Sequence, residues 1–195
     1  LMDYRFRQRG LRNRVEIVAF TPEPMPMPVT GPVVGAAVKS LLTGRGIAFN
    51  GGHKLTAVDA GRRELVFEGN ARESYDLLVA IPPHRAPPVV KAAGLVSETG
   101  WVSVDRFTLK TSHSDVYALG DITYIKLASG LPLPKAGVFA HHQAEVVARN
   151  IAAEVEGRKA EERFTGQGKC FVEVGYGRAA MGAGDFYAEP APAVR

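Results

Sequence analysis

The sequence predicts an α/β fold in which a parallel sheet, a β-hairpin and a long helix follow one another along the chain. Three observations lead to this prediction: a strand, a helix and a second strand near the start, a pair of alternating segments after them, and a long run with helical spacing over residues 136–156. Strands joined by a helix form parallel pairs, whereas strands joined by a tight turn form antiparallel ones. We therefore expect a mixed architecture built mainly on a parallel sheet.

The opening part of the chain predicts one strand-helix-strand unit. The strand segments are β-branched and aromatic, four prolines exclude regular structure from the loop, and Gly44 and Gly46 follow the helix. Proline suits the first turn of a helix and glycine its end. The expected elements are a helix over residues 1–9, a strand over 15–20, a loop over 21–28, a helix over 32–42 and a strand over 47–49.

The middle of the chain predicts a hairpin and further short strands. Residues 54–59 and 64–68 alternate in polarity around a turn at 60–63, which is typical of an antiparallel pair. Residues 76–81 are an apolar run stopped by two prolines, which predicts a buried strand. Further strands are expected at residues 101–105, 116–119 and 168–175.

Composition excludes several classes of protein. The 195 residues are 46% hydrophobic and 23% charged, as in a globular chain of one large or two small domains. The net charge of +4 comes partly from arginines near the start that lack the aromatic partners of a nucleic-acid site, so we interpret them as a solvated helix end. These arginines are Arg5, Arg7, Arg9, Arg12 and Arg14. The single cysteine excludes an internal disulfide framework.

The stretch from Thr111 to Asp121 carries the clearest functional signal. Residues 116–119 predict a short buried strand that runs into Gly120 and Asp121. Ligands of open α/β sheets sit at the carboxyl ends of strands, and a glycine there lets another group approach the backbone closely. Asp121 is therefore placed to accept a hydrogen bond from a ligand hydroxyl.

This stretch resembles the second flavin-binding motif of the two-dinucleotide-domain flavoproteins, in which a threonine, an apolar run and Gly-Asp place the acid on the ribityl and pyrophosphate part of FAD. The order of elements is also similar to the second half of such a protein. The resemblance implies a Rossmann-like α/β fold and FAD as the cofactor. It further implies three segments: residues 1–82 as the remainder of the NAD(P)-like dinucleotide-binding domain, 83–157 as the return segment that completes the FAD domain, and 158–195 as a C-terminal interface segment.

No G-x-G-x-x-G loop occurs in the sequence, although the amides of such a loop normally hold the FAD pyrophosphate at the start of a helix. We therefore expect the chain to be the later part of a longer polypeptide. The rest of the cofactor site would come from a preceding half or from a second copy of the chain. By itself the chain is expected to be colourless and inactive.

Residues at the start of the long helix indicate the position of the flavin ring through the same resemblance. The run Pro134-Lys135-Ala136-Gly137 is similar to the Pro-Lys-Thr-Gly of sulfide:quinone oxidoreductases and of the flavoprotein subunit of flavocytochrome c sulfide dehydrogenase. In those proteins the amino end of the helix faces the pyrimidine edge of the flavin, where reduction places negative charge, and Lys135 would add a positive charge there. From its sequence context alone, Lys135 could instead be a solvated lysine ahead of a helix.

Cys170 is the candidate catalytic residue. It lies in the strand expected after the long helix, where the resembled family carries the second of two redox cysteines beside the flavin. A thiolate that attacks an incoming sulfur atom, next to a flavin that accepts two electrons, suits the oxidation of sulfur compounds. Without the resemblance, a lone cysteine beside Phe171 is most often a small buried hydrophobe.

The leading hypothesis is an FAD-dependent oxidoreductase of the sulfide:quinone type, which oxidises sulfide or a related sulfur species and passes the electrons to a quinone or a cytochrome. Two alternatives stay open. One is a flavin dehydrogenase that takes electrons from NAD(P)H, similar to a type II NADH:quinone or ferredoxin reductase. The other is an inactive, flavin-free fragment.

The remaining predictions concern location and partners. We expect a cytoplasmic protein with peripheral membrane contact, because no apolar run approaches the length of a membrane span. Membrane-bound members of the resembled family usually end in amphipathic helices, whereas prolines exclude such a helix from residues 188–195. The acceptor is therefore left open between quinone and cytochrome. The scattered histidines lack the spacing of metal ligands, so we predict no metal site.

Overall fold

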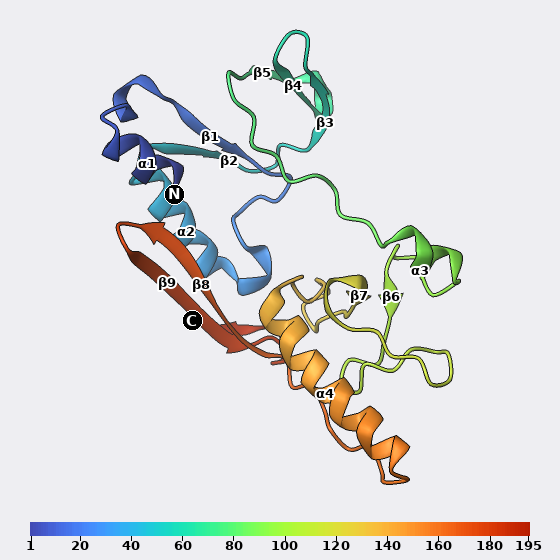
Figure 1. Cartoon of the computed structure of the whole chain (residues 1–195). Coiled ribbons are helices and arrows are strands. Elements are labelled where there is room, and N and C mark those ends of the chain that lie inside the picture. Colours follow the sequence, from blue (N-terminus) through green and yellow to red (C-terminus); the bar gives the residue numbers. More distant parts are fainter. The chain divides into compact units, whose positions relative to one another are not determined.

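The computed structural model describes residues 1–195 and divides into two compact units (Figure 1). Unit 1 comprises Leu1–Pro82 with Glu173–Ala180, and unit 2 comprises Pro83–Val172 with Met181–Arg195. The chain therefore passes from the first unit to the second after Pro82, returns to the first for the turn of a late hairpin, and ends in the second.

Unit 1 holds the blue to green part of the chain in Figure 1. Its helices are α1 (Met2–Gln8) and α2 (Pro32–Thr43), with short 3-10 turns η1 (Arg12–Arg14), η2 (Pro28–Thr30) and η3 (Glu68–Asn70). Its strands are β1 (Ile17–Phe20), β2 (Ile47–Asn50), β3 (Leu55–Asp59), β4 (Glu64–Phe67) and β5 (Arg72–Ser74).

The predicted strand-helix-strand unit is confirmed. β1 and β2 pair in parallel, with Ile17 opposite Ile47, and α2 connects them and packs beside β2. The helix begins at Pro32, because the fixed φ of proline suits the first turn of a helix. Proline lacks an N–H, but an N–H at this position would have no hydrogen-bond acceptor within the helix. It ends at Thr43, next to the predicted glycine.

The predicted hairpin is also confirmed, and the structure extends it by one strand. β3 and β4 are antiparallel, with a register shift between Leu55 and Ala57. β5 pairs with the other edge of β4, so the sheet has the order β3-β4-β5. The third strand was not predicted, because its sequence Arg-Glu-Ser lacks the apolar alternation that indicates a half-buried strand.

The buried strand predicted over residues 76–81 is wrong. Leu77, Val79 and Ile81 are 73%, 70% and 85% exposed, and residues 76–86 make no backbone-to-backbone hydrogen bond. An apolar run favours a buried strand only where other strands and helices are present to pair with it and cover it. Within this chain none does, so the segment stays extended and unpaired.

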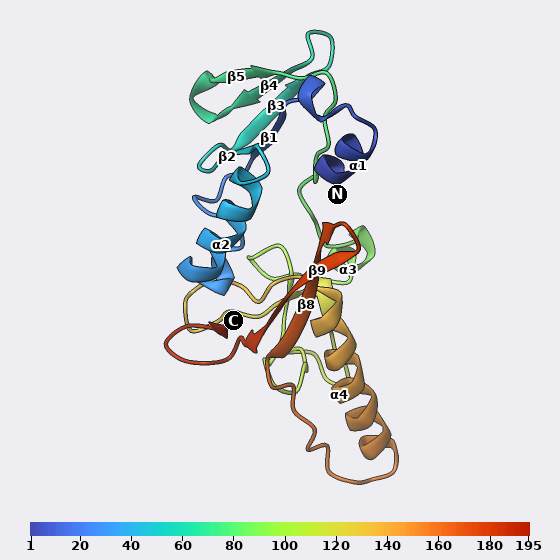
Figure 2. The ribbon, with the colours of Figure 1, turned by 90° about the vertical axis from the view of Figure 1, so that its left-hand side faces the viewer.

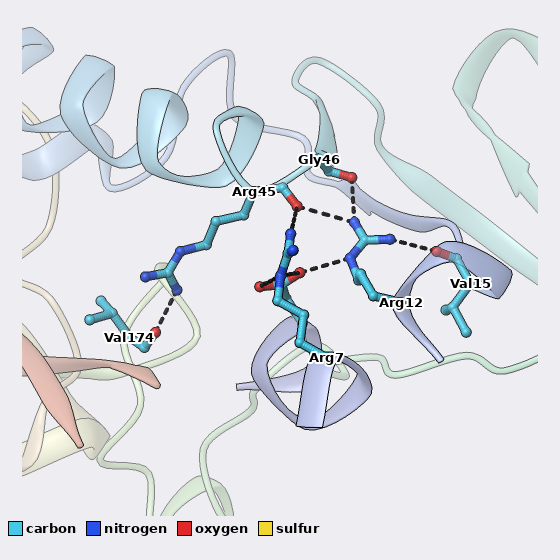
Figure 3. A network of polar contacts seen from close by, with 7 residues as sticks. Arg7, Arg12, Val15, Arg45, Gly46 and Val174 are labelled. Atoms are coloured by element: carbon cyan, nitrogen blue, oxygen red, sulfur yellow. Dashed lines mark hydrogen bonds and ion pairs between the residues drawn. The ribbon is translucent and has the colours of Figure 1, made fainter. Parts of the chain in front are cut away.

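A buried carboxylate organises the start of unit 1 (Figure 3). Asp3 is 3% exposed and accepts hydrogen bonds from Arg7 Nε at 3.0 Å and Arg12 Nε at 2.7 Å. Burial alone would raise the pKa of Asp3, but the hydrogen bonds and charges of the two arginines hold it below its ordinary value. Arg12 also donates to the carbonyls of Val15, Arg45 and Gly46.

This network corrects one prediction about the basic cluster. The side chain of Arg12 is only 15% exposed, so it is a structural connector between α1, η1 and the start of β2 rather than part of a solvated surface. Arg5, Arg9 and Arg14 are exposed, as predicted. A pattern of basic residues cannot distinguish a solvated arginine from a buried, paired one, because the difference depends on where the carboxylate of Asp3 lies in the fold.

Unit 2 contains the long helix, which Figure 2 shows as the orange ribbon. Its helices are α3 (Pro88–Ala92) and α4 (Gly137–Val155), with the 3-10 turn η4 (Gly120–Ile122). Its strands are β6 (Val102–Ser103), β7 (Thr123–Tyr124), β8 (Gln167–Gly175), β9 (Arg178–Asp185) and β10 (Ala193–Val194). β6 and β7 pair in parallel, whereas β10, β9 and β8 form a separate sheet in that order.

The late hairpin of β8 and β9 confirms the strand predicted over residues 168–175, and its turn belongs to unit 1. There Arg45 donates a hydrogen bond to the carbonyl of Val174 at 2.5 Å, as Figure 3 also shows. The proline-broken tail forms the short strand β10, in which Ala193 lies opposite Asp185. The tail is thus an edge strand of the sheet.

The strand predicted over residues 116–119 is wrong, although its position in the chain is informative. These residues are half-buried and extended, and only Tyr117 forms a bridge, to Lys110. Two backbone hydrogen bonds hold the segment as a loop. The Leu109 N–H donates to the Asp105 carbonyl, and the Ala118 N–H donates to the Leu109 carbonyl. The parallel ladder begins two residues after Asp121 instead, at Thr123.

α4 contributes apolar residues to the core of unit 2. Phe139, Val146 and Val147 are buried, and they join Val102, Leu109, Ile125 and Phe164 in that core. Ile151 and Val155 continue the helical spacing of apolar residues, but they are 43% and 82% exposed. The polar residues Gln143 and Asn150 are instead buried on the helix, each 1% exposed.

Candidate functional site

One pocket of unit 2 brings together four of the five residues predicted to hold a cofactor, namely Gly120, Asp121, Lys135 and Ala136, whereas Gly137 does not line it. The pocket lies between η4, the start of β7 and the first turns of α4. The lining residues are Gly120, Asp121, Thr123, Ile125, Leu133, Pro134, Lys135, Ala136, Phe139, Ala140 and Gln143.

Gly120 brings η4 close to α4. Its φ is +71°, a left-handed conformation that favours glycine, and a Cβ there would stand 3.2 Å from the Cβ of Ala140. The Gly120 N–H donates to Gln143 Oε1 at 2.6 Å, and Thr123 Oγ1 donates to the Gly120 carbonyl at 2.8 Å. The backbone at this corner is therefore fixed on both sides.

Asp121 follows at the same corner, where its side chain is exposed and makes no hydrogen bond or ion pair within the protein. A carboxylate in this state offers all its lone pairs to a ligand. The nearby backbone is rigid, so the carboxylate has a fixed origin. This geometry suits an acceptor for the hydroxyls of a bound sugar or sugar alcohol.

Lys135 lines the same pocket as Asp121. Lys135 Nζ donates to the carbonyls of Asp121 and Thr123, the latter at 3.0 Å. It also lies 3.5 Å from the centroid of the Trp101 ring. Burial lowers the pKa of Lys135, and the neighbouring Asp121 carboxylate offsets this only in part. Lys135 is thus half-buried and anchored by backbone oxygens.

The amino end of α4 supplies free donors beside Lys135. Ala136 is the N-cap and Gly137 the first helical residue, and no side chain caps the helix. The N–H groups of Gly137 and Val138 have no backbone acceptor, since the first such bond is from Phe139 to Ala136. A helix of 19 residues carries partial positive charge at this end. The helix start and Lys135 together favour an electronegative group on a ligand.

The two halves of the pocket therefore complement a ligand with hydroxyls at one end and a negatively charged or carbonyl-bearing group at the other. These are the features of the ribityl chain and of the pyrimidine edge of FAD. The residues present fit that part of the cofactor.

Cys170 lies outside this pocket. It is exposed on β8, so the alternative of a buried hydrophobe is wrong. Two residues earlier on the same strand, Gly168 packs against the ring of Phe139, and a Cβ at Gly168 would overlap that ring. Alternate residues of a strand lie on the same face, so Cys170 is on the same face of β8 as Gly168. That face contacts Phe139 at Gly168, and Phe139 lines the pocket.

Two residues of the site were missed by sequence reasoning. Gln143 lies four residues after Phe139 on the predicted apolar face of the helix, so a polar side chain in that position was a usable signal. Trp101 gave no signal, because nothing in the sequence relates it to Lys135, 34 positions later in the numbering.

The fold and the pocket are those of an α/β protein in which a carboxylate without a partner, Asp121, lies beside the start of a helix. The family model described as pyridine nucleotide-disulphide oxidoreductase matches residues 5–149. The chain belongs to this family, as the resemblance of its motifs predicted.

Known relatives agree with this assignment. The chain is 25% identical to the mitochondrial sulfide:quinone oxidoreductase of Mus musculus over 95% of its length, and 26% identical to that of Schizosaccharomyces pombe over 96%. The fold is similar to that of the sulfide:quinone oxidoreductase of Aquifex aeolicus, with a TM-score of 0.77 at 19% identity, over 100% of this chain and 48% of the other. The predicted fold class is confirmed.

The chain spans 41% of the length of each of these two mitochondrial relatives. Among its helices, none combines the length and the apolar character that crossing a membrane requires.

Proposed function

We propose that the chain is part of an FAD-dependent oxidoreductase of the sulfide:quinone type, in which residues 83–157 complete the FAD domain. One observation carries the proposal. Asp121, Lys135 and Ala136, the N-cap of α4, line one pocket, although they come from separate segments of the chain. The similarity to sulfide:quinone oxidoreductases of two organisms supports the choice of reaction class.

Each residue has a distinct task in this proposal. Asp121 accepts hydrogen bonds from cofactor hydroxyls, and Gly120 keeps the backbone close enough for them to reach it. Lys135 and the amides of Gly137 and Val138 stabilise negative charge on the pyrimidine edge. When bound, the flavin supplies a two-electron acceptor. Lys135 is held by carbonyl oxygens before any ligand arrives, so little reorganisation is needed.

Cys170 is proposed as the sulfur-reactive group. Its exposure leaves the thiol accessible to a small sulfur nucleophile or electrophile, as thiolate chemistry requires. The electrons released when the sulfur species is oxidised leave through the flavin to a quinone or a cytochrome. A second thiol is needed for a redox disulfide, and Cys170 is the single cysteine of the 195 residues.

Titration with FAD tests the cofactor part of the proposal. We expect the chain to bind FAD weakly, because it lacks a glycine-rich pyrophosphate loop. The binding is therefore measured by the anisotropy of flavin fluorescence rather than by the colour of the preparation. Asp121→Ala and Lys135→Met should each weaken binding. Lys159→Met, which removes a lysine that is 84% exposed, should not. Equal affinity in all four proteins would refute the assignment of the pocket.

Reduction of bound flavin tests the sulfur part. In the longer polypeptide of which the chain is proposed to be part, loaded with FAD and carrying a second thiol, sulfide should bleach the flavin absorption and NADH should not. Cys170→Ser should remove reduction by sulfide while leaving FAD affinity unchanged. Bleaching by NADH alone would establish the alternative, a flavin dehydrogenase fed by NAD(P)H.

A further inference from the structure

Trp101 contacts the charged end of Lys135. It precedes β6, and the Lys135 ammonium lies over its ring at 3.5 Å from the centroid. The other contacts of the ammonium are the carbonyls of Asp121 and Thr123, which come from η4 and β7. Three segments of unit 2 thus converge on one nitrogen atom.

This arrangement restricts a side chain that is otherwise flexible. A lysine has a four-carbon stem and loses considerable rotamer freedom when it is held in one place. The two carbonyls fix two N–H directions, and the negative face of the indole attracts the positive charge from another side. The indole also replaces water there. Asp121 is the charged group that acts on Lys135 in this setting.

We propose that Trp101 is the positioning residue for Lys135: its indole face holds the ammonium at the pocket, beside Asp121 and the start of α4, so that the charge is in place before an electronegative ligand group arrives. This inference rests on the proposed function, in which Lys135 faces the flavin. Trp101 touches Lys135 rather than the reacting atoms, so it acts through the lysine.

Nuclear magnetic resonance of the chain labelled at lysine tests the contact without any cofactor. Ring currents of an indole shift protons above its face upfield, so one lysine ε-methylene signal should be displaced from the rest. Lys135→Met assigns that signal by removing it. We expect Trp101→Leu to abolish the displacement and Trp101→Phe to retain part of it, because phenylalanine keeps an aromatic face. No displaced lysine signal in the parental chain would overturn the proposal.

Fluorescence gives a second test that leaves Trp101 in place. Trp101 is the single tryptophan of the chain, so its emission reports this site alone. An ammonium at the ring quenches emission by giving a proton to the excited indole. Lys135→Met should therefore brighten the emission, whereas the matched Lys159→Met should leave it unchanged. Equal emission from all three proteins would contradict the stacked geometry.

FAD titration connects the contact to the site and separates the two proposals. A cation–π contact of about 0.5–2 kcal/mol corresponds to an affinity change on the order of two-fold to thirty-fold, so Trp101→Leu should weaken FAD binding within that range and Trp101→Phe should weaken it less. If no protein binds FAD but the lysine signal behaves as expected, the proposed function fails and the lysine contact stands. If FAD binds equally to all three proteins, the positioning role is refuted.

Discussion

Replacing Gln143 with leucine is expected to destabilise unit 2 by about 1–2 kcal/mol. Gln143 is 1% exposed and accepts the hydrogen bond of the Gly120 N–H at 2.6 Å. Leucine keeps the volume and the helix propensity of glutamine, so the lost hydrogen bond dominates the change. An unpaired buried donor costs about 1–3 kcal/mol, and we take the lower part because Gly120 is only half-buried.

Urea unfolding followed by Trp101 emission measures this loss. The single tryptophan lies in unit 2, so its signal reports the unfolding of that unit. With a slope of about 2 kcal/mol per molar urea, the midpoint should fall by roughly 0.5–1 M without a change of slope. Glu145→Ala, at an exposed position of the same helix, is the matched control and should stay within about 0.5 kcal/mol of the parent. Equal midpoints for the two variants would refute the reasoning.

Further predictions concern other parts of the chain. Asp3→Asn removes the acid that pairs two arginines, so we expect a loss of about 2 kcal/mol at neutral pH in thermal or urea unfolding of unit 1. The pKa of Asp3 is lowered from its ordinary 3.8, so its contribution to the free energy of unfolding is complete above that pH and is lost as the pH falls below it. The unfolding free energy of the variant should not show this loss. Leu77, Val79 and Ile81 are exposed, so a lysine at each position should change stability by less than about 0.5 kcal/mol. The same substitutions should raise solubility in ammonium sulfate, because they remove exposed apolar side chains. A large loss of stability would indicate that these side chains are buried. Cys170 should react with a disulfide reagent in the native protein at nearly the rate found in urea, and strong protection would contradict its exposure.

Local pattern was sufficient where a segment and its immediate neighbours in sequence decide the structure. α2 and α4 follow from helical spacing with proline or glycine at their ends, and the β3–β4 hairpin follows from alternation around a turn. The parallel pairing of β1 and β2 could be predicted because a helix joins them. In each case the interaction that decides the structure lies within a few tens of residues.

Pattern failed where burial depends on a partner that sequence cannot locate. The apolar runs at residues 76–81 and 116–119 indicate segments that would gain from being covered, but neither forms a strand here. Ile151 and Val155 lie on a side of α4 that stays exposed, whereas Asn150 and Ala153 in the same turns are buried. Hydrophobic spacing indicates a candidate face, but the neighbouring segments decide which face of the helix is covered.

The sequence by itself determined the family and the separate halves of the candidate site, because Gly120-Asp121 and Lys135-Ala136-Gly137 are short motifs whose backbone requirements are local. Only the tertiary structure decided that Lys135 reaches back to the carbonyl of Asp121, that Gln143 holds Gly120, and that Trp101 covers the ammonium. These contacts join side chains across loops of differing length. Their geometry depends on how η4, β7 and α4 pack, and packing is a property of all the residues of unit 2 together.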